Sequence, residues 1–183
     1  MAKAKIVSFD GHDCVGKTSL MSATVHALSE KGLSVTMFRS VNKDFETERL
    51  RHSEVSQNIW FYVSAWLNTE KEILKSVDST NFIFIDRSYY STMVLAGALD
   101  LYFPHFLLQT FLKPDYAFWV QVSEEERMRR LERKRATRED YITVNATLIS
   151  KADLIYTSLG LLPLNNEGPL QDGAQRLSAI LLR

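Results

Sequence analysis

Two glycines, a lysine and a threonine near the amino end of the chain have the spacing G-x-x-x-x-G-K-[ST]. This pattern is typical of loops that bind nucleotide phosphates. In such a loop the backbone N–H groups surround the anion, the lysine reaches the β- and γ-phosphates, and the hydroxyl ligates Mg²⁺. We therefore predict a site for Mg·ATP, with Lys17 and Thr18 in these two roles. The residues predicted to contact ATP are Gly11, His12, Asp13, Cys14, Val15, Gly16, Lys17, Thr18 and Ser19.

The segments on either side of this loop support the prediction. Residues 6–9 are apolar and predict a buried strand, whereas residues 19–28 contain few helix breakers and predict a helix. This order places several N–H groups and the positive end of the helix dipole at one point. The alternative is a chance match in a glycine-containing turn, with Lys17 as an ordinary surface residue. The flanking segments favour phosphate binding.

Asp86 and Arg87 follow a further apolar segment, residues 82–85, which also predicts a buried strand. A carboxylate at the end of a strand beside a phosphate loop holds Mg²⁺ or its water shell in this architecture. We therefore predict that Thr18 and Asp86 bind the metal and that Arg87 contacts an anionic group of the phosphoryl acceptor. The alternatives are a helix-capping role for Asp86 and a surface ion pair for Arg87.

The segment from residue 123 to residue 140 is highly charged. Ser123 and Glu126 form an S-x-x-E capping box, which predicts the start of a helix. Pairs at i,i+4, such as Glu125–Arg129 and Glu126–Arg130, indicate that most of these charges belong to a solvated helix face.

Basic residues crowd a predicted loop after this helix. Arginines that close over a transferring phosphoryl group stabilise its charge and exclude water. Residues from about 133 to 142 are therefore predicted to form a mobile lid. The residues predicted to be catalytic are Lys17, Asp86, Arg87 and the lid arginines Arg133, Arg135 and Arg138.

The elements that must position these residues alternate along the chain. Strands are predicted at residues 6–9, 33–38, 82–85, 116–122 and 161–164. Helices are predicted at residues 19–28, 59–74, 89–99, 143–159 and 169–182, and in the charged segment after residue 123. A strand is an alternative for the aromatic residues 59–67. The alternation predicts an α/β fold, in which residues 1–183 form a single domain with a parallel, five-stranded sheet and helices on both faces.

The composition excludes several classes of function. The 22 lysines and arginines equal the 22 aspartates and glutamates, and this zero net charge gives no support to nucleic-acid binding. No apolar run approaches the ~20 residues of a membrane-spanning helix. The histidines show no metal-ligand spacing. Cys14 is the one cysteine, which excludes an intrachain disulfide and suits a reducing compartment, so a cytoplasmic location is expected.

The chain resembles the thymidylate kinase family over nearly its whole length. Residues 9–18 are similar to the family motif F-E-G-x-D-G-x-G-K-[ST], and Asp86-Arg87 is similar to D-R-[YF]. Arg39 falls on the arginine of the motif T-R-E-P, and residues 113–115, Lys-Pro-Asp, match in order and spacing. The resemblance implies a three-layer P-loop kinase fold, ATP-dependent phosphorylation of a nucleoside monophosphate, and a homodimer.

By the same resemblance, the residues that contact the acceptor nucleotide are Asp13, Arg39, Tyr62, Trp66 and Arg87. Asp13 matches an aspartate that reaches the sugar, and Arg87 matches an arginine that contacts the acceptor phosphate. Tyr62 matches a phenylalanine that stacks on the base. Trp66 departs from the pattern, because the family has a phosphate-binding arginine there. The loop has no basic residue at positions 14 and 15, which resembles the subgroup whose catalytic arginine comes from the lid.

The missing arginine leaves the identity of the acceptor open. Loss of a charge-assisted phosphate contact would cost ~1.5–3 kcal/mol of binding. The acceptor would then be dTMP or a related nucleotide, or else an unphosphorylated nucleoside or other small metabolite. The second alternative has a motif in its favour, because residues 86–88, Asp-Arg-Ser, also resemble the [DE]-R-S motif of deoxynucleoside kinases. An alcohol acceptor would need a general base, for which Asp10, Asp13 and Asp86 are the candidates. The alternative from another class is a regulatory protein that binds ATP without turnover.

Overall fold

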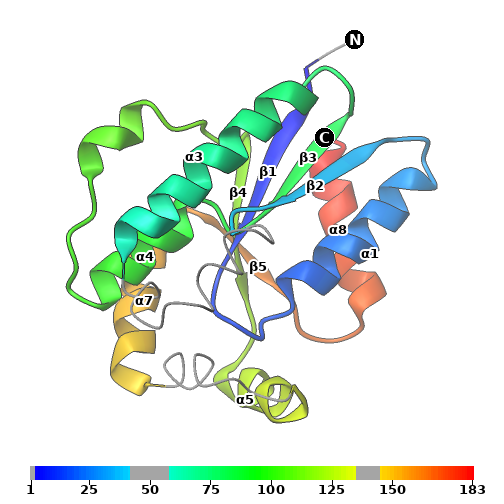
Figure 1. Ribbon diagram of the computed structural model, residues 1–183. Helices are drawn as coiled ribbons and strands as arrows, with labels where there is room; N and C mark the ends of the chain where they lie inside the picture. Colours follow the sequence, from blue (N-terminus) through cyan, green and yellow to red (C-terminus); the bar gives the residue numbers. More distant parts are fainter. Residues whose placement is uncertain (1–2, 42–57, 135–144) are drawn as a thin grey trace.

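The computed structural model describes residues 3–41, 58–134 and 145–183. Its centre is a parallel sheet with the strand order β2-β3-β1-β4-β5 (Figure 1). The strands are β1 (Lys5–Asp10), β2 (Val35–Arg39), β3 (Phe82–Asp86), β4 (Tyr116–Gln121) and β5 (Leu162–Asn165). The predicted five-stranded parallel sheet is confirmed, and its strands differ from the predicted ranges only at their ends.

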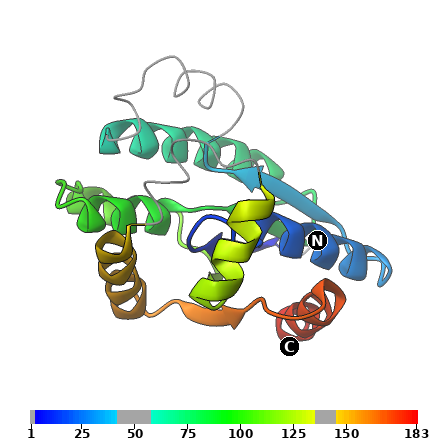
Figure 2. The same ribbon diagram turned by 90° about the horizontal axis from the view of Figure 1, so that it is seen from below.

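Helices cover both faces of the sheet, which gives three layers (Figure 2). One face is covered by α1 (Lys17–Ser29) and α8 (Leu170–Leu181), and the other by α3 (Ile59–Ser76), α4 (Tyr89–Ala98) and α7 (Ala146–Ser158). A short 3₁₀ helix, η2 (His105–Gln109), follows α4, and α5 (Glu124–Arg133) follows β4. The aromatic residues 59–67 lie within α3, so the strand alternative is wrong. None of the helices in the described ranges has the length and apolar character needed to cross a membrane.

The core follows from the alternation of side chains along the buried strands. All five residues of β3 are buried, as expected for a central strand covered on both faces. Ile83 and Ile85 belong to one core cluster together with Trp66 of α3. Phe84 belongs to the cluster on the opposite face, which includes Leu20 of α1.

The register of the sheet brings the ends of several strands together. Asp86 of β3 is aligned with Phe9 of β1 and with Arg39 of β2, and Asp10 is aligned with Trp119 of β4. Parallel strands end at the same edge of a sheet, and ligands of open α/β folds bind outside that edge. The two aspartates and Arg39 therefore lie where a ligand is expected.

The charged segment forms the helix that its capping box predicts. The Ser123 hydroxyl accepts a hydrogen bond from the N–H of Glu126. The Glu126 side chain does not reach back to Ser123, because it accepts hydrogen bonds from both Arg129 and Arg130. The predicted pair Glu126–Arg130 is confirmed. Arg129 is predicted to pair with Glu125, but in the structure it pairs with Glu126.

Candidate active site

The loop between β1 and α1 has the geometry of an anion site. Gly16 is the N-cap of α1 with φ 85°, no side chain caps the helix, and its first turn contains no acidic residue. The unpaired N–H groups and the dipole of this 13-residue helix favour a bound anion. Gly11 has φ 141°, and a Cβ atom there would lie 2.5 Å from the carbonyl oxygen of Val120. Only glycine fits at position 11.

Lys17 is folded back onto this loop. Its Nζ donates to the carbonyl oxygens of Gly11 (3.1 Å) and His12 (2.7 Å), and the residue is only 6% exposed. Burial lowers the pKa of Lys17 to about 8, and the charge of Arg87 acts in the same direction. A phosphate in the loop would replace the two carbonyl oxygens as the partner of the ammonium group and would raise its pKa.

Thr18 and Asp86, 68 residues apart in the sequence, are in contact. The Thr18 hydroxyl donates to Asp86 Oδ2 at 2.6 Å, and the carboxylate is buried. Mg²⁺ commonly takes one or two protein oxygens and completes its shell with water and phosphate oxygens, and this pair fits such an ion. Within the described ranges no group of three or more His, Cys, Asp or Glu side chains could hold a metal. A metal at this pair would therefore depend on the nucleotide phosphates.

Arg87 reaches the loop from the turn after β3. Its φ of 67° lies in the left-handed region, which is uncommon for a residue other than glycine and often marks functional sites. The guanidinium donates to the Gly11 carbonyl oxygen at 3.1 Å and forms an ion pair with Asp13. The charge of Arg87, assisted by Lys17, holds the pKa of Asp13 well below its usual range. Asp13, Lys17 and Arg87 thus form one charged group at the loop.

Asp10 is engaged in hydrogen bonds that hold the structure. It is fully buried, and it accepts four hydrogen bonds from the N–H and hydroxyl groups of Ser88 and Ser91. Ser88 is the N-cap of α4, and its hydroxyl accepts from the N–H of Tyr90. The helix-capping alternative for Asp86 is therefore wrong.

His12 connects the loop to α7. Its Nε2 lies 2.7 Å from Asp153 Oδ1, and its ring contacts Tyr156 edge to face. His12 therefore has a structural contact that its position in the sequence does not indicate.

Two other predicted ATP contacts lie at the surface of the loop. Cys14 is partly exposed and has φ 65°, and Ser19 is exposed in the first turn of α1.

Two residues that are not among the predicted site residues hold the loop from outside. Arg130 of α5 and Asn166, after β5, donate to the Val15 carbonyl oxygen at 2.9 Å and 2.8 Å. They also fill the space beside Gly16, where a Cβ atom would lie 2.7 Å from Asn166 Nδ2 and 2.9 Å from Arg130 Nη1. In the sequence Arg130 belongs to a run of charges and Asn166 to no pattern. No sequence signal distinguishes either residue from its neighbours.

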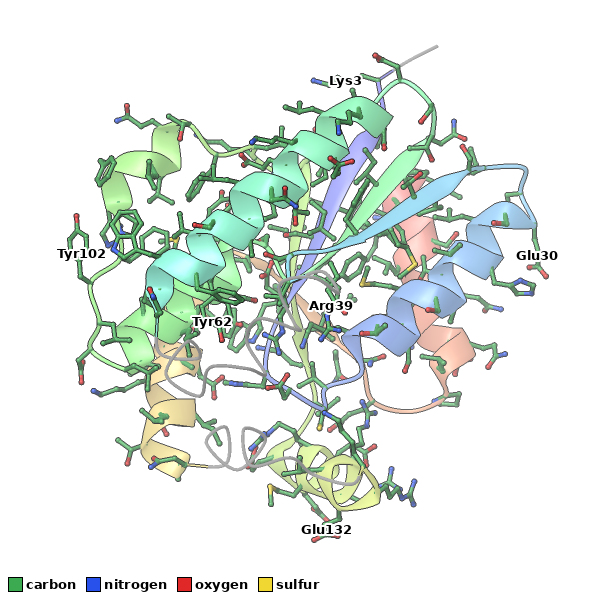
Figure 3. All side chains as sticks on the ribbon, in the orientation of Figure 1. Lys3, Glu30, Arg39, Tyr62, Tyr102 and Glu132 are labelled. Atoms are coloured by element: carbon green, nitrogen blue, oxygen red, sulfur yellow. The ribbon has the colours of Figure 1, made fainter. Side chains whose placement is uncertain are left out.

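Of the residues predicted to contact the acceptor, Asp13 and Arg87 lie at the loop, and the other three fall into two groups. Figure 3 shows Arg39 and Tyr62 at the same end of the sheet. Arg39 is exposed, and Tyr62 is partly exposed. Trp66 is fully buried, with its ring 5.5 Å from that of Tyr89. Trp66 therefore packs in the core between α3 and α4, and its contact with the acceptor stays a prediction.

The predicted lid lies largely outside the described residues. Arg133, the last residue of α5, is exposed. Arg135 and Arg138 lie in the range 135–144, which the structure does not describe. The catalytic role of all three arginines stays a prediction.

Comparison with known proteins assigns this chain to a family. The family model for thymidylate kinase matches residues 9–157, a range that contains the loop, Asp86 and Arg87. The chain is 26% identical to the thymidylate kinase of Leptospira borgpetersenii serovar Hardjo-bovis over 156 residues. This aligned segment covers 78% of this chain and 75% of that protein. The chain is 26% identical over 155 residues to the thymidylate kinase of Leptospira interrogans serovar copenhageni (78% and 76%) and 22% identical over 144 residues to that of Rickettsia typhi (72% and 71%). The chain belongs to the thymidylate kinase family.

Membership of the thymidylate kinase family makes the chain a nucleoside monophosphate kinase, which is a transferase. It confirms the resemblance that the motifs at residues 9–18 and at Asp86-Arg87 indicate. At 22–26% identity the chain is a divergent member of the family. This low sequence identity is consistent with the departure at Trp66, which is a core residue at the position where the resemblance predicts a phosphate-binding arginine.

Proposed function

We propose that the chain transfers the γ-phosphoryl group of Mg·ATP to the phosphate of a nucleoside monophosphate, dTMP or a related nucleotide. The observation that supports this best is the position of Arg87. A guanidinium that binds Gly11 and Asp13 supplies a second cation beside Lys17. Two cations at one loop suit a reaction in which two phosphate groups must approach each other.

In this proposal each side chain has a defined task. Lys17 leaves the carbonyl oxygens of the loop and binds the β- and γ-phosphates, together with the loop amides. Thr18 and Asp86 would hold Mg²⁺, which would neutralise charge on the phosphates. Arg87 and Arg39 orient the phosphate of the acceptor, and the sugar hydroxyl lies near Asp13, as the family resemblance implies.

The transfer itself then needs little further chemistry from the protein. The bond between the γ-phosphorus and the bridging oxygen breaks, and ADP keeps the electron pair. A new bond forms between that phosphorus and an oxygen of the acceptor phosphate. This oxygen is already anionic, so no general base is required.

The candidate bases for an alcohol acceptor are all engaged in the described structure. Asp10 accepts four hydrogen bonds, and Asp86 accepts the hydrogen bond of Thr18. The ion pair with Arg87 keeps the pKa of Asp13 low, which makes this carboxylate a weak base. These contacts favour a phosphate over a hydroxyl as the acceptor.

An acceptor panel tests the proposal. The purified chain is incubated with labelled Mg·ATP and with dTMP, dUMP, other nucleoside monophosphates and thymidine, and Lys17→Met serves as the control. We expect labelled diphosphate from dTMP or a close relative, and none from Lys17→Met. Product from thymidine alone would reject the proposal.

That outcome would instead support the second candidate, a kinase of unphosphorylated nucleosides. The observation in its favour is the burial of Trp66 at the position of a phosphate-binding arginine. The cytoplasmic location and the homodimer stay predictions of the sequence and of the family resemblance.

A further inference from the structure

Arg127 is a buried guanidinium on a helix that is otherwise mostly exposed. Of the ten residues of α5, only Arg127 and Leu131 are buried. The Arg127 side chain is 2% exposed. Arginine is almost never fully buried unless it is paired, because an unpaired buried charge is strongly destabilising.

Within the described ranges, the ion-pair partner of Arg127 occupies one edge of the guanidinium, and Nη2 also lies 4.0 Å from Met128 Sδ. Glu124 accepts hydrogen bonds from Nε and from Nη2, each at 2.7 Å. The remaining nitrogen, Nη1, is buried and has no hydrogen-bond partner within the described structure. A buried donor without an acceptor is costly, so a bound molecule that supplied an acceptor at Nη1 would stabilise the charged group.

The face of α5 that carries Arg127 is turned toward the phosphate loop. Arg130 lies one turn further along the same face, and its Nη1 is 2.9 Å from the Val15 carbonyl oxygen. The hydrogen bonds with Glu124 raise the pKa of Arg127 against the effect of its burial, and Cys14 and Asp13 of the loop act in the same direction. Figure 1 and Figure 2 show α5 beside this loop at the carboxyl edge of the sheet.

We propose that Arg127 is a phosphate-binding residue, whose Nη1 donates a hydrogen bond to the phosphate chain of ATP when the nucleotide occupies the loop. The inference rests on the proposed function, because it requires a nucleotide phosphate at this place. Lys17 is a mobile point charge, whereas the two hydrogen bonds to Glu124 fix the orientation of Arg127. Arg127 supplies the loop with a positive charge that its positions 14 and 15 lack.

A matched pair of variants tests this role. Arg129 lies two residues away, is 49% exposed, and is held by Glu126 through the same two nitrogens, Nε and Nη2. Arg127→Met and Arg129→Met therefore each remove one charge and one two-point ion pair from the same helix. Isothermal titration calorimetry measures the binding of Mg·ATP and of inorganic tripolyphosphate to both variants. We expect Arg127→Met to weaken the binding of both ligands about 10- to 100-fold, and Arg129→Met to change it by less than about threefold.

Thermal denaturation distinguishes phosphate binding from a purely structural role. A variant Arg127→Met that melts earlier but binds tripolyphosphate like the wild-type chain would overturn the proposal. Equal losses in the two variants, or a wild-type chain that binds neither ligand, would also overturn it. If Arg127→Met does not fold, Arg127→Lys, which keeps the charge but has a single donor group, is compared in the same way. Weaker tripolyphosphate binding supports the proposal, and wild-type affinity rejects it.

The proposed function fails in a different way. The wild-type chain would then bind tripolyphosphate in an Arg127-dependent manner and yet transfer no phosphoryl group to any nucleoside monophosphate. Transfer to dTMP that survives Arg127→Met, with unchanged affinity for ATP, would reject only the role of Arg127. Both measurements use the same full-length protein.

Discussion

The Thr18 hydroxyl lies 2.6 Å from the Asp86 carboxylate, and this hydrogen bond joins the first turn of α1 to the end of β3. The two residues come from separate motifs, one in the phosphate loop and one at the end of an apolar strand. Their contact places a hydroxyl and a carboxylate beside the unpaired N–H groups of a helix. A divalent cation and the phosphate that it accompanies would therefore find their partners in one place.

Replacement of Asp86 by Asn tests this pairing. An amide oxygen is neutral and attracts Mg²⁺ less strongly than a carboxylate does, while the size of the side chain is unchanged. We expect the rate of phosphoryl transfer to fall about 100-fold or more, and the concentration of Mg²⁺ needed for half-maximal activity to rise. Steady-state assays over a range of Mg²⁺ concentrations measure both. The control is Asp172→Asn on the exposed surface of α8. An unchanged requirement for Mg²⁺ in Asp86→Asn would remove Asp86 from the metal site.

Lys17 should make nucleotide binding depend on pH. With a pKa of about 8, about half of the protein carries a neutral Lys17 at pH 8. Bound phosphate favours the charged form, so ATP binding should take up to about half a proton at pH 8, and affinity should fall as the pH rises further. Calorimetry in buffers of different ionisation enthalpy measures this uptake. In Lys17→Arg, whose side chain stays charged, the uptake should disappear, and its persistence would assign the proton to another group.

The same shift has a consequence for stability, with a definite sign. The pKa of Lys17 in the folded protein lies below its ordinary value of 10.5, so between about pH 8 and 10.5 the unfolded chain binds more protons. The contribution of Lys17 to the free energy of unfolding therefore rises with pH across this window. Urea denaturation of the nucleotide-free protein and of Lys17→Met, measured at pH 7.5 and at about pH 9.5, isolates this contribution.

Gly11 and Gly168 form a matched pair for the geometry of the loop. Both have positive φ angles, 141° and 83°, but a Cβ atom at Gly11 would lie 2.5 Å from the Val120 carbonyl oxygen, whereas one at Gly168 meets nothing within 4 Å. Gly11→Ala should lower the free energy of unfolding by about 2–4 kcal/mol. Gly168→Ala should lower it by about 1 kcal/mol. Urea denaturation measures both, and similar losses would show that the backbone at position 11 yields easily.

Local patterns were sufficient to predict most of the fold. The segments around residues 6–9 and 82–85 are short apolar runs with turn residues after them, and both are buried strands in the structure. The phosphate-loop pattern depends on glycine spacing and on a helix start, which are also local properties. The contact between Thr18 and Asp86 follows once both motifs lie at the same edge of a parallel sheet.

Contacts between segments distant in the sequence could not be predicted in this way. Asn166 reaches the Val15 carbonyl oxygen across 151 residues of sequence, and Arg130 reaches it across 115. Neither contact follows from spacing or propensity, because both depend on how α5 and the end of β5 lie against the loop. The burial of Arg127 has the same origin, since the other residues from 121 to 130 are exposed or partly exposed.

Trp66 is a position where the sequence contained the necessary signal. Ile59, Val63, Trp66 and Ile73 of α3 are all buried and recur at intervals of three, four and seven residues, which is the spacing of one helix face. This periodicity indicates a core residue. The family resemblance indicated an acceptor-binding residue at the same position, and the packing against Tyr89 agrees with the periodicity.

Trp66 and Tyr62, one helical turn apart on α3, should therefore respond differently to substitution. Removal of the buried ring in Trp66→Ala leaves a cavity and should lower the free energy of unfolding by about 3–5 kcal/mol, whereas Trp66→Phe should leave the KM for the acceptor unchanged. Tyr62 is partly exposed, and if its ring stacks on the acceptor base, Tyr62→Ala should raise that KM about tenfold, since such stacking contributes about 1–3 kcal/mol. Urea denaturation and acceptor titrations of the three variants measure these effects. A Trp66→Phe variant of normal stability with a several-fold higher acceptor KM would instead indicate that Trp66 contacts the acceptor. A core ring that makes no such contact should leave this KM unchanged while the fold is intact.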